Sequence, residues 1–196
     1  MLYLRWLETS RRHAARTAVF DGGHSVTFAE LAAMVEAAED SNRTVVARTG
    51  SIRFFVDLLR AWKDGKTALP LEKDAPEPVL KLTPPEEARL VKYTPGASGV
   101  PRAIFFNDAQ LIADGDRLFQ AMGLSAQVPN LAVISLAHSY GFSNVVLPLV
   151  LHGVPVSLAP VPFPRVIEEI CAKHEKIAIP AVPSIWRAWH RAGILK

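Results

Sequence analysis

Cysteine is almost absent from this 196-residue chain, which contains only Cys171. A disulfide within the chain is therefore impossible, and such sparse cysteine is typical of proteins from a reducing compartment. Long hydrophobic runs are also missing, because the longest mostly apolar stretches, 131–137 and 145–151, have seven residues each. Neither can span a bilayer, and the charged stretch 1–16 contains no apolar segment of signal-peptide length. These absences predict a soluble, cytoplasmic protein without a membrane span.

No charge of one sign dominates, since 22 Lys and Arg face 19 Asp and Glu for a net charge of +3. The basic residues are scattered, so the charge pattern does not call for a nucleic-acid partner. Cys171 and His174 are close in sequence, but no second ligand pair has suitable spacing, and we predict no metal site. Both side chains are expected to pack on the apolar face of a helix.

Hydrophobic periodicity predicts an α/β fold of mixed and parallel sheets with flanking helices. A hydrophobic content of 49% suffices for a sizeable core. Expected helices cover 4–15, 28–35, 52–62, 108–122, 142–151, 164–174 and 184–192. Expected strands cover 17–20, 25–27, 44–48, 67–71, 88–93, 103–106, 131–136, 154–159 and 177–182. The segment 76–88, rich in proline and charge, divides an N-terminal lobe, 1–75, from a second lobe, 89–196.

Individual residues give more specific predictions about where helices begin and which side chains are buried. Thr27 and Glu30 have the spacing of a capping box, and Ser51 is a candidate N-cap. Met122 is expected to face inward at the end of its helix. Trp186 and Trp189 are candidate anchors for structure outside this stretch of chain, and their exposure would cause self-association.

The most distinctive motif is the stretch 93–102, YTPGASGVPR, between two expected strands. Its two glycines allow a tight turn and a close approach of backbone to a ligand. Thr94 and Ser98 provide hydroxyl groups, Arg102 provides a planar cation, and successive backbone N–H groups in such a turn can bind an anion. These residue types indicate a phosphate-binding loop, with an ordinary hairpin turn as the alternative.

This stretch resembles the loop Y-T-S-G-S/T-T-G-x-P-K-G of the acyl-adenylate-forming enzymes, which include acyl- and aryl-CoA synthetases, luciferases and peptide-synthetase adenylation domains. Pro95, Ala97 and Ala103 depart from that pattern. Pro95 matters most, because it removes one hydroxyl group and one backbone N–H from the cradle. The resemblance implies that the β- and γ-phosphates of ATP are held by Thr94, Gly96, Ser98, Gly99 and Arg102.

A second match follows in the order usual for these enzymes. The stretch 136–142, LAHSYGF, precedes an apolar helix and His152-Gly153, and it resembles the H-x-x-G segment of the same family. The resemblance places His138, as a catalytic residue, between the acyl group and the nucleotide, with His138, Tyr140 and Phe142 around the acyl pocket. A structural histidine at a strand end is the alternative.

The resemblance implies an AMP-forming ligase that activates a small carboxylic acid with ATP and Mg²⁺, with coenzyme A as a possible acceptor. The aromatic-Gly-x-Thr-Glu motif, the ribose-binding Asp and the catalytic Lys of such enzymes have no match here, and the interval before the loop is shorter than usual. We therefore expect an N-terminal part that is catalytically incomplete alone and depends on a missing C-terminal segment or a partner chain.

Two alternatives remain. One is a non-catalytic interaction domain descended from such a ligase, which Pro95 and the missing motifs favour. The other is a serine hydrolase with Ser98 as nucleophile and His138 as base. The nucleophile-elbow pattern G-x-S-x-G fails for the latter, because Val100 occupies the position of the second glycine.

Overall fold

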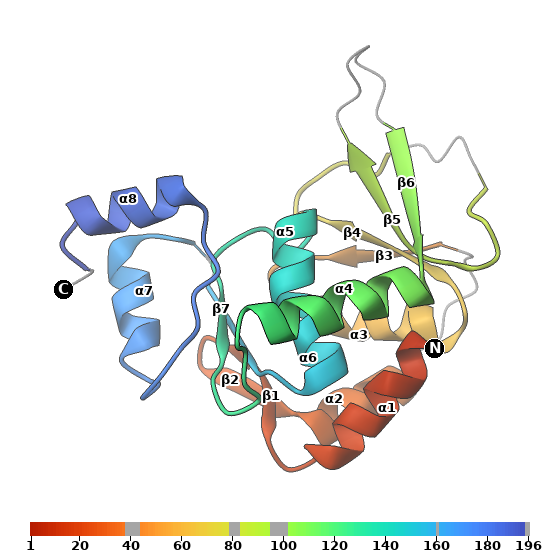
Figure 1. Cartoon of the computed structure of the whole chain (residues 1–196), viewed down its shortest axis with the longest axis horizontal. Coiled ribbons are helices and arrows are strands. Elements are labelled where there is room, and N and C mark those ends of the chain that lie inside the picture. Colours follow the sequence, from red (N-terminus) through yellow and green to blue (C-terminus); the bar gives the residue numbers. More distant parts are fainter. Residues whose placement is uncertain (38–43, 79–82, 95–101, 160, 195–196) are drawn as a thin grey trace.

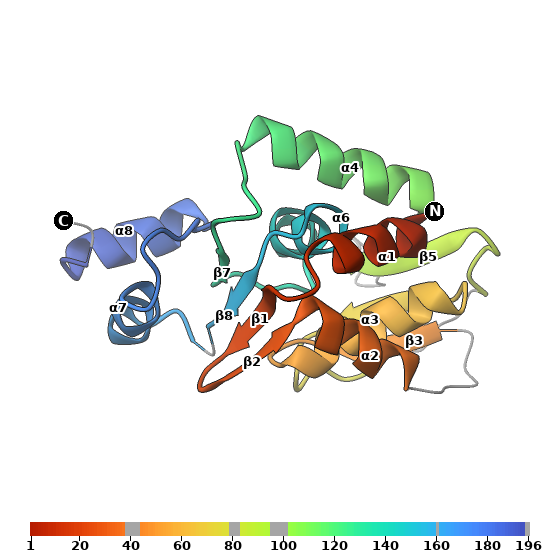
Figure 2. The ribbon, with the colours of Figure 1, turned by 90° about the horizontal axis from the view of Figure 1, so that it is seen from below.

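The computed structural model describes residues 1–37, 44–78, 83–94, 102–159 and 161–194. Within these residues, eight strands form two four-stranded sheets, and helices lie between and outside them (Figures 1 and 2). The helices are α1 (Leu2–Arg12), α2 (Phe28–Glu36), α3 (Ile52–Lys63), α4 (Asp108–Ala121), α5 (Ser139–Gly141), the π-helix η1 (Phe142–Val146), α6 (Leu147–His152), α7 (Pro164–Cys171) and α8 (Pro183–Arg191). None of the helices in this described part is long and apolar enough to cross a membrane.

The first sheet, called sheet A, joins the two halves of the chain. It consists, in spatial order, of β2 (His24–Thr27), β1 (Thr17–Asp21), β8 (Val156–Leu158) and β7 (Asn130–Ala132). β1 and β2 form an antiparallel hairpin around a two-residue turn, Gly22 and Gly23, while β1, β8 and β7 run parallel. The carboxyl ends of these three parallel strands therefore meet at one edge of the sheet.

The second sheet, sheet B, also draws on both halves. It consists of β3 (Thr44–Arg48), β4 (Thr67–Leu71), β5 (Ala88–Thr94) and β6 (Arg102–Asn107), in this order. β3, β4 and β5 are parallel, and β6 returns antiparallel to β5. The stretches 1–75 and 89–196, expected as separate lobes, thus share both sheets, because strands of each stretch are hydrogen-bonded to strands of the other.

The larger hydrophobic core lies between the two sheets. Ala132 of β7 contributes to this core, whereas its neighbours Leu131 and Val133 belong to a smaller core with α7 and α8. This division follows from the alternation of side chains along a strand. Sheet A is therefore covered on both faces, by the central helices on one side and by α7 and α8 on the other (Figure 2).

Of the two capping signals expected from the sequence, one is present in full. Thr27 and Glu30 form the predicted capping box: the Glu30 N–H donates to Thr27 Oγ1 at 3.1 Å, and the Thr27 N–H donates to Glu30 Oε2 at 2.7 Å. Asn107 and Gln110 form a second capping box at α4, which the sequence analysis missed. Ser51 is the N-cap residue of α3 but makes no side-chain cap hydrogen bond, so that expectation is confirmed only in position.

Three predicted strands are shorter or absent. The strand expected at 154–159 is reduced to β8. The strand expected at 131–136 is reduced to β7, because the Val133 N–H turns back to the Leu131 carbonyl at 3.0 Å and the chain leaves the sheet. The strand expected at 177–182 is a single bridge between Asn130 and Ala178 in the described chain. Pro180 follows shortly after and has no N–H to extend the ladder.

The single helix expected at 142–151 is divided into η1 and α6, with α5 before them. Pro148 causes this irregularity, because it cannot donate a hydrogen bond to the Asn144 carbonyl four residues earlier. The Asn130 side chain donates to that carbonyl instead, at 2.9 Å, and Asn130 is fully buried. An asparagine from β7 thus satisfies the carbonyl that the proline leaves without its helical partner.

Three further expectations need correction. Met122 is 55% exposed and does not face inward. The helix expected to reach His174 ends at Cys171, and His174 packs edge-on against Phe20 of β1. Trp189 is buried within the chain, where its indole N–H donates to the Pro162 carbonyl at 3.0 Å, so it is not an anchor waiting for an outside partner.

Gly153, which ends α6, provides a test of this packing. Its φ of +69° is unfavourable for other residues, and a Cβ there would lie 2.3 Å from His13 Cδ2. We expect Gly153→Ala to lower the free energy of unfolding, measured in urea, by more than the roughly 1–2 kcal/mol of a left-handed residue alone. Gly123→Ala is the matched control, because Gly123 has φ +58° and open space around it. Equal losses in the two variants would contradict the close contact with His13.

Candidate functional site

The two described ends of the predicted phosphate loop lie side by side. Thr94, the last residue of β5, is paired in register with Arg102, the first residue of β6, and both side chains are exposed. The intervening residues 95–101, which include Gly96, Ser98 and Gly99, lie outside the described residues. Because β3, β4 and β5 are parallel, Thr94 stands at the edge where their carboxyl ends meet, a usual ligand position in α/β sheets.

Arg102 is available to an anion at this position. It forms no ion pair with any other residue in the described ranges, and its side chain is exposed. A guanidinium group provides several N–H donors in a fixed plane, which suits the oxygen atoms of a phosphate.

His138 is placed by a tight turn between β7 and α5. It is the N-cap residue of α5, its side chain is exposed, and its backbone N–H donates to Ser135 Oγ at 3.3 Å. Gly141 explains why the turn is so compact, since a Cβ at this residue would lie 2.0 Å from the Ser135 carbonyl oxygen. The glycine of the H-x-x-G segment therefore allows α5 to pack directly on the backbone that precedes His138.

Tyr140 and Phe142 follow His138 but differ in their surroundings. Tyr140 is 45% exposed, whereas Phe142 is 1% exposed. The Phe142 ring lies edge-on to Trp62, and Lys92 Nζ lies 4.5 Å from its centroid. In the described part of the chain Phe142 is thus a core residue between β5 and α3, and its role in an acyl pocket stays a prediction.

Lys92 is an unusual residue for the interior face of a sheet. It lies two residues before Thr94 on β5 and is only 9% exposed. Burial lowers the pKa of Lys92 from 10.5 to about 8, and the negative charge of Asp114 on α4 opposes this shift. Asp114 itself accepts a hydrogen bond from Ser143 Oγ at 2.6 Å. The strand that leads into the predicted phosphate loop is thereby linked to the π-helix that follows His138.

A cleft of about 480 Å³ lies where the carboxyl ends of strands from both sheets converge. Glu72, directly after β4, accepts a hydrogen bond from Thr49 Oγ1 at 2.9 Å and another from Ser135 Oγ across the cleft. Ser135 also receives the backbone N–H of His138, so His138 stands beside this cleft. The sequence analysis did not single out Thr49, Glu72 or Ser135, although Thr49 and Glu72 each directly follow a predicted strand.

The described residues contain no group of three or more His, Cys, Asp or Glu side chains arranged to hold a metal ion. The site formed by these residues consists of hydroxyl groups, the Glu72 carboxylate, the exposed Arg102 guanidinium and the exposed His138 imidazole. Such groups can bind and orient an anionic ligand and transfer protons near it.

Several solved structures have backbones similar to that of this chain. O-succinylbenzoate coenzyme A synthetase (MenE) from Bacillus subtilis, solved in complex with AMP, superimposes with a TM-score of 0.80 over 96% of this chain, at 14% identity. MbtA from Mycobacterium smegmatis gives 0.79 over 98% at 17% identity, and the N-terminal subdomain of NpsA from Klebsiella oxytoca, in complex with anthranilyl-AMSN, gives 0.69 over 87% at 16% identity. The chain has the fold of the N-terminal portion of adenylate-forming ligases.

The chain spans 64% of the MenE chain, 50% of MbtA and 58% of the NpsA subdomain. No protein-family model and no curated protein matches the sequence. At this level of identity the likeness concerns the fold, so the residues of the site are argued from their own geometry.

The pKa of Lys92 predicts a pH dependence of stability. Because this pKa is lower in the folded protein than in the unfolded chain, the unfolded state binds more protons between pH 8 and 10.5. We therefore expect the contribution of Lys92 to the free energy of unfolding to increase as the pH is raised from 8 to 10.5, by at most roughly 3 kcal/mol.

The difference between the parent protein and Lys92→Met isolates this contribution, because other titrating groups cancel. Urea unfolding at several pH values should show the parent gaining stability relative to Lys92→Met between pH 8 and 10.5. The exposed residue Lys73, changed to Met, is the control and should follow the parent. A constant difference between the parent and Lys92→Met would show that Lys92 is not desolvated.

The turn before α5 is open to a similar test. We expect Gly141→Ala to destabilise the protein by about 2 kcal/mol or more, because the clash is with backbone atoms that cannot rotate away. Chemical unfolding measures the loss, and the NMR signal of the His138 ring should shift. Gly23→Ala, which meets no atom within 4 Å and requires no positive φ, should change stability far less.

Proposed function

We propose that this chain is the ATP- and acyl-binding part of an AMP-forming ligase similar to acyl- and aryl-CoA synthetases. The main support is the position of the motif YTPGASGVPR. Its two described ends meet at the carboxyl edge of sheet B, in a fold shared with a synthetase that was solved with AMP.

In the proposed reaction, an oxygen of the substrate carboxylate attacks the α-phosphorus of ATP. A bond forms between that oxygen and phosphorus, the bond to the bridging oxygen breaks, and pyrophosphate leaves as acyl-AMP forms. Thr94, Gly96, Ser98, Gly99 and Arg102 hold the β- and γ-phosphates and stabilise the charge of the leaving group. The sulfur of a thiol such as coenzyme A then attacks the acyl carbon, the bond from that carbon to the phosphate oxygen breaks, AMP leaves, and the thiol proton passes to solvent.

His138 and Tyr140 are proposed to face the carboxylate substrate. Both side chains are exposed, and the backbone N–H of His138 is hydrogen-bonded to Ser135 of the cleft at the carboxyl ends of the strands, so His138 is open to a ligand that enters from this edge. The described residues offer no cluster of ligands for Mg²⁺. We propose that its ligands and the groups that bind ribose come from a further segment or a partner chain, so that the chain alone binds nucleotide but is a poor catalyst.

A non-catalytic interaction domain with the same fold is the second candidate. Pro95 supports it, because proline removes a backbone N–H from the loop that is proposed to hold the phosphates. The two candidates differ in whether the loop binds nucleotide at all.

Binding can be measured by thermal unfolding with Mg-ATP and with a non-hydrolysable acyl-AMP analogue. A ligand at 100 times its Kd should add roughly 2.7 kcal/mol of stability. We expect stabilisation in the parent, loss of stabilisation in both Ser98→Ala and Arg102→Ala, and full stabilisation in Arg165→Ala. Arg165 is a suitable control because it is an exposed arginine on α7, which lies on the other side of the molecule from β5 and β6 (Figure 1).

Stabilisation that survives in both loop variants would place the nucleotide elsewhere and remove the support for the ligase proposal. No stabilisation by either ligand would favour the interaction domain. Labelling of Ser98 by a fluorophosphonate would instead support a serine hydrolase.

A further inference from the structure

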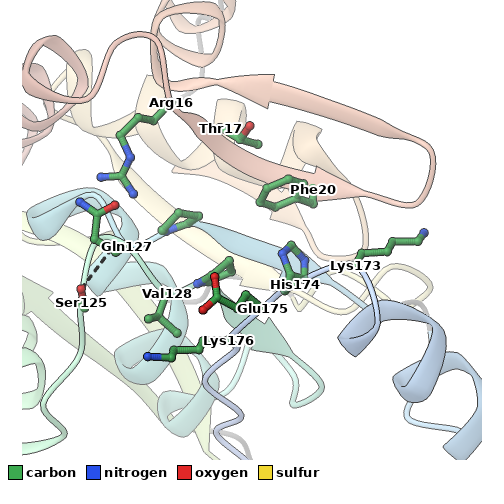
Figure 3. Close-up of a pocket in the computed structure, with 12 residues that line it drawn as sticks. Arg16, Thr17, Phe20, Ser125, Gln127, Val128, Lys173, His174, Glu175 and Lys176 are labelled. Atoms are coloured by element: carbon green, nitrogen blue, oxygen red, sulfur yellow. Dashed lines mark hydrogen bonds between the residues drawn. The ribbon is translucent and has the colours of Figure 1, made fainter.

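A second cavity lies at the opposite edge of sheet A from the proposed site. It has a volume of about 720 Å³ and is bordered by Thr17 at the start of β1 and by Pro129 and Pro155, which directly precede β7 and β8 (Figure 3). The amino ends of three parallel strands therefore border it, whereas the proposed nucleotide site is at their carboxyl side. A cavity of this size is within the range that binds small molecules.

The charged side chains around this cavity are mostly basic. Arg16, Lys173 and Lys176 line it together with one acidic residue, Glu175, and with His174, whose pKa is lowered by burial and by the nearby Lys173. In the described part of the chain, none of these five side chains takes part in an ion pair. The excess of cations over carboxylates therefore attracts an anionic ligand.

Arg16 is held rigidly at one wall. Its guanidinium group donates to the Ala126 carbonyl and lies 3.0 Å from His13 Nδ1. These two contacts leave other N–H donors of the five on a guanidinium group. Figure 3 shows Arg16 and Lys176 on different walls, with His174 and Phe20 on a third side, so a ligand in the cavity would meet cations from two elements far apart in sequence.

The rest of the lining is apolar. The rings of Phe20 and His174 lie edge-to-face with centroids 4.9 Å apart, and Val128, Pro129 and Pro155 contribute aliphatic surface. Ser125 and Gln127 add polar groups at the rim, and the Gln127 N–H donates to Ser125 Oγ at 3.1 Å. The cavity thus combines cationic walls with an aromatic and aliphatic surface.

We propose that this cavity is a second ligand site, which binds a phosphomonoester carried on an aromatic or apolar group. Arg16 and Lys176 hold the phosphate, and the organic group packs on Phe20 and the two prolines. The site is independent of the proposed ATP loop, because it is at the other edge of sheet A and shares no residue with it.

Binding of phenyl phosphate to the full chain, followed by calorimetry and by NMR shifts, tests this proposal. We expect binding in the parent, about tenfold weaker binding in Lys176→Gln after loss of one charge-assisted contact, and unchanged binding in Arg187→Gln. Arg187 is an exposed arginine on α8 that lines neither this cavity nor the cleft at the carboxyl ends of the strands, so it controls for general charge. The NMR signals of Phe20 and His174 should shift on binding.

Two further compounds test the two parts of the ligand separately: inorganic phosphate lacks the aromatic ring, and benzoate lacks the phosphate group. Each is expected to bind at least tenfold more weakly than phenyl phosphate. Equal affinity for inorganic phosphate would overturn the proposed organic subsite. Absence of phenyl phosphate binding, or binding lost in Arg102→Gln but kept in Lys176→Gln, would overturn the site itself. The last result would place the phosphate on the loop of the proposed ligase, so the two proposals fail separately.

Discussion

The arrangement of the molecule depends on the enclosure of one apolar helix, the continuous segment η1 and α6. Its side chains from Val145 to Val150 are buried around the whole circumference, so it has no face that could be exposed to water. Burial of such a helix requires cover on every side. Sheet A, sheet B, α1 and α4 provide that cover, and the stretches before and after the helix in sequence must therefore fold around it together.

Three glycines allow the close contacts that this enclosure requires. Gly115 of α4 faces Leu147 and Leu151, where a Cβ would lie 2.5 Å from Leu151 Cδ1. Gly141 lets the segment before the helix pack on the backbone at Ser135, and Gly153 ends the helix against His13. The close contacts at the side of the helix and at both of its ends are thus possible only because each of these three residues has no side chain.

The same helix connects the two parts of the proposed site. Phe142 begins η1 four residues after His138, and its ring lies beneath Lys92, two residues before Thr94. A shift of the helix would therefore move the turn that carries His138 relative to the strand that leads into the predicted phosphate loop. Asp114 and Ser143 add a polar link at the same place, in surroundings where burial makes the charge of Lys92 costly.

Much of the local structure could be predicted from the sequence. The strands 44–48 and 67–71 and the capping box of Thr27 and Glu30 depend on neighbouring residues, and each was confirmed. The expected strand at 177–182 was wrong because alternation alone does not show whether a neighbouring strand is present to accept it. The π-helix was missed because its cause is shared between Pro148 and the distant Asn130.

The sequence by itself determined the fold class and most of the order of its elements, because hydrophobic period, caps and turns act over a few residues. It also provided the motif YTPGASGVPR and the histidine at 138 as candidate site residues. Only the tertiary structure decided that strands from both halves share each sheet, that Glu72 bridges Thr49 and Ser135, and that Arg16 lies across a cavity from Lys176. These relations join residues far apart in the chain, and they arise because the apolar helix can be buried only when both sheets close around it.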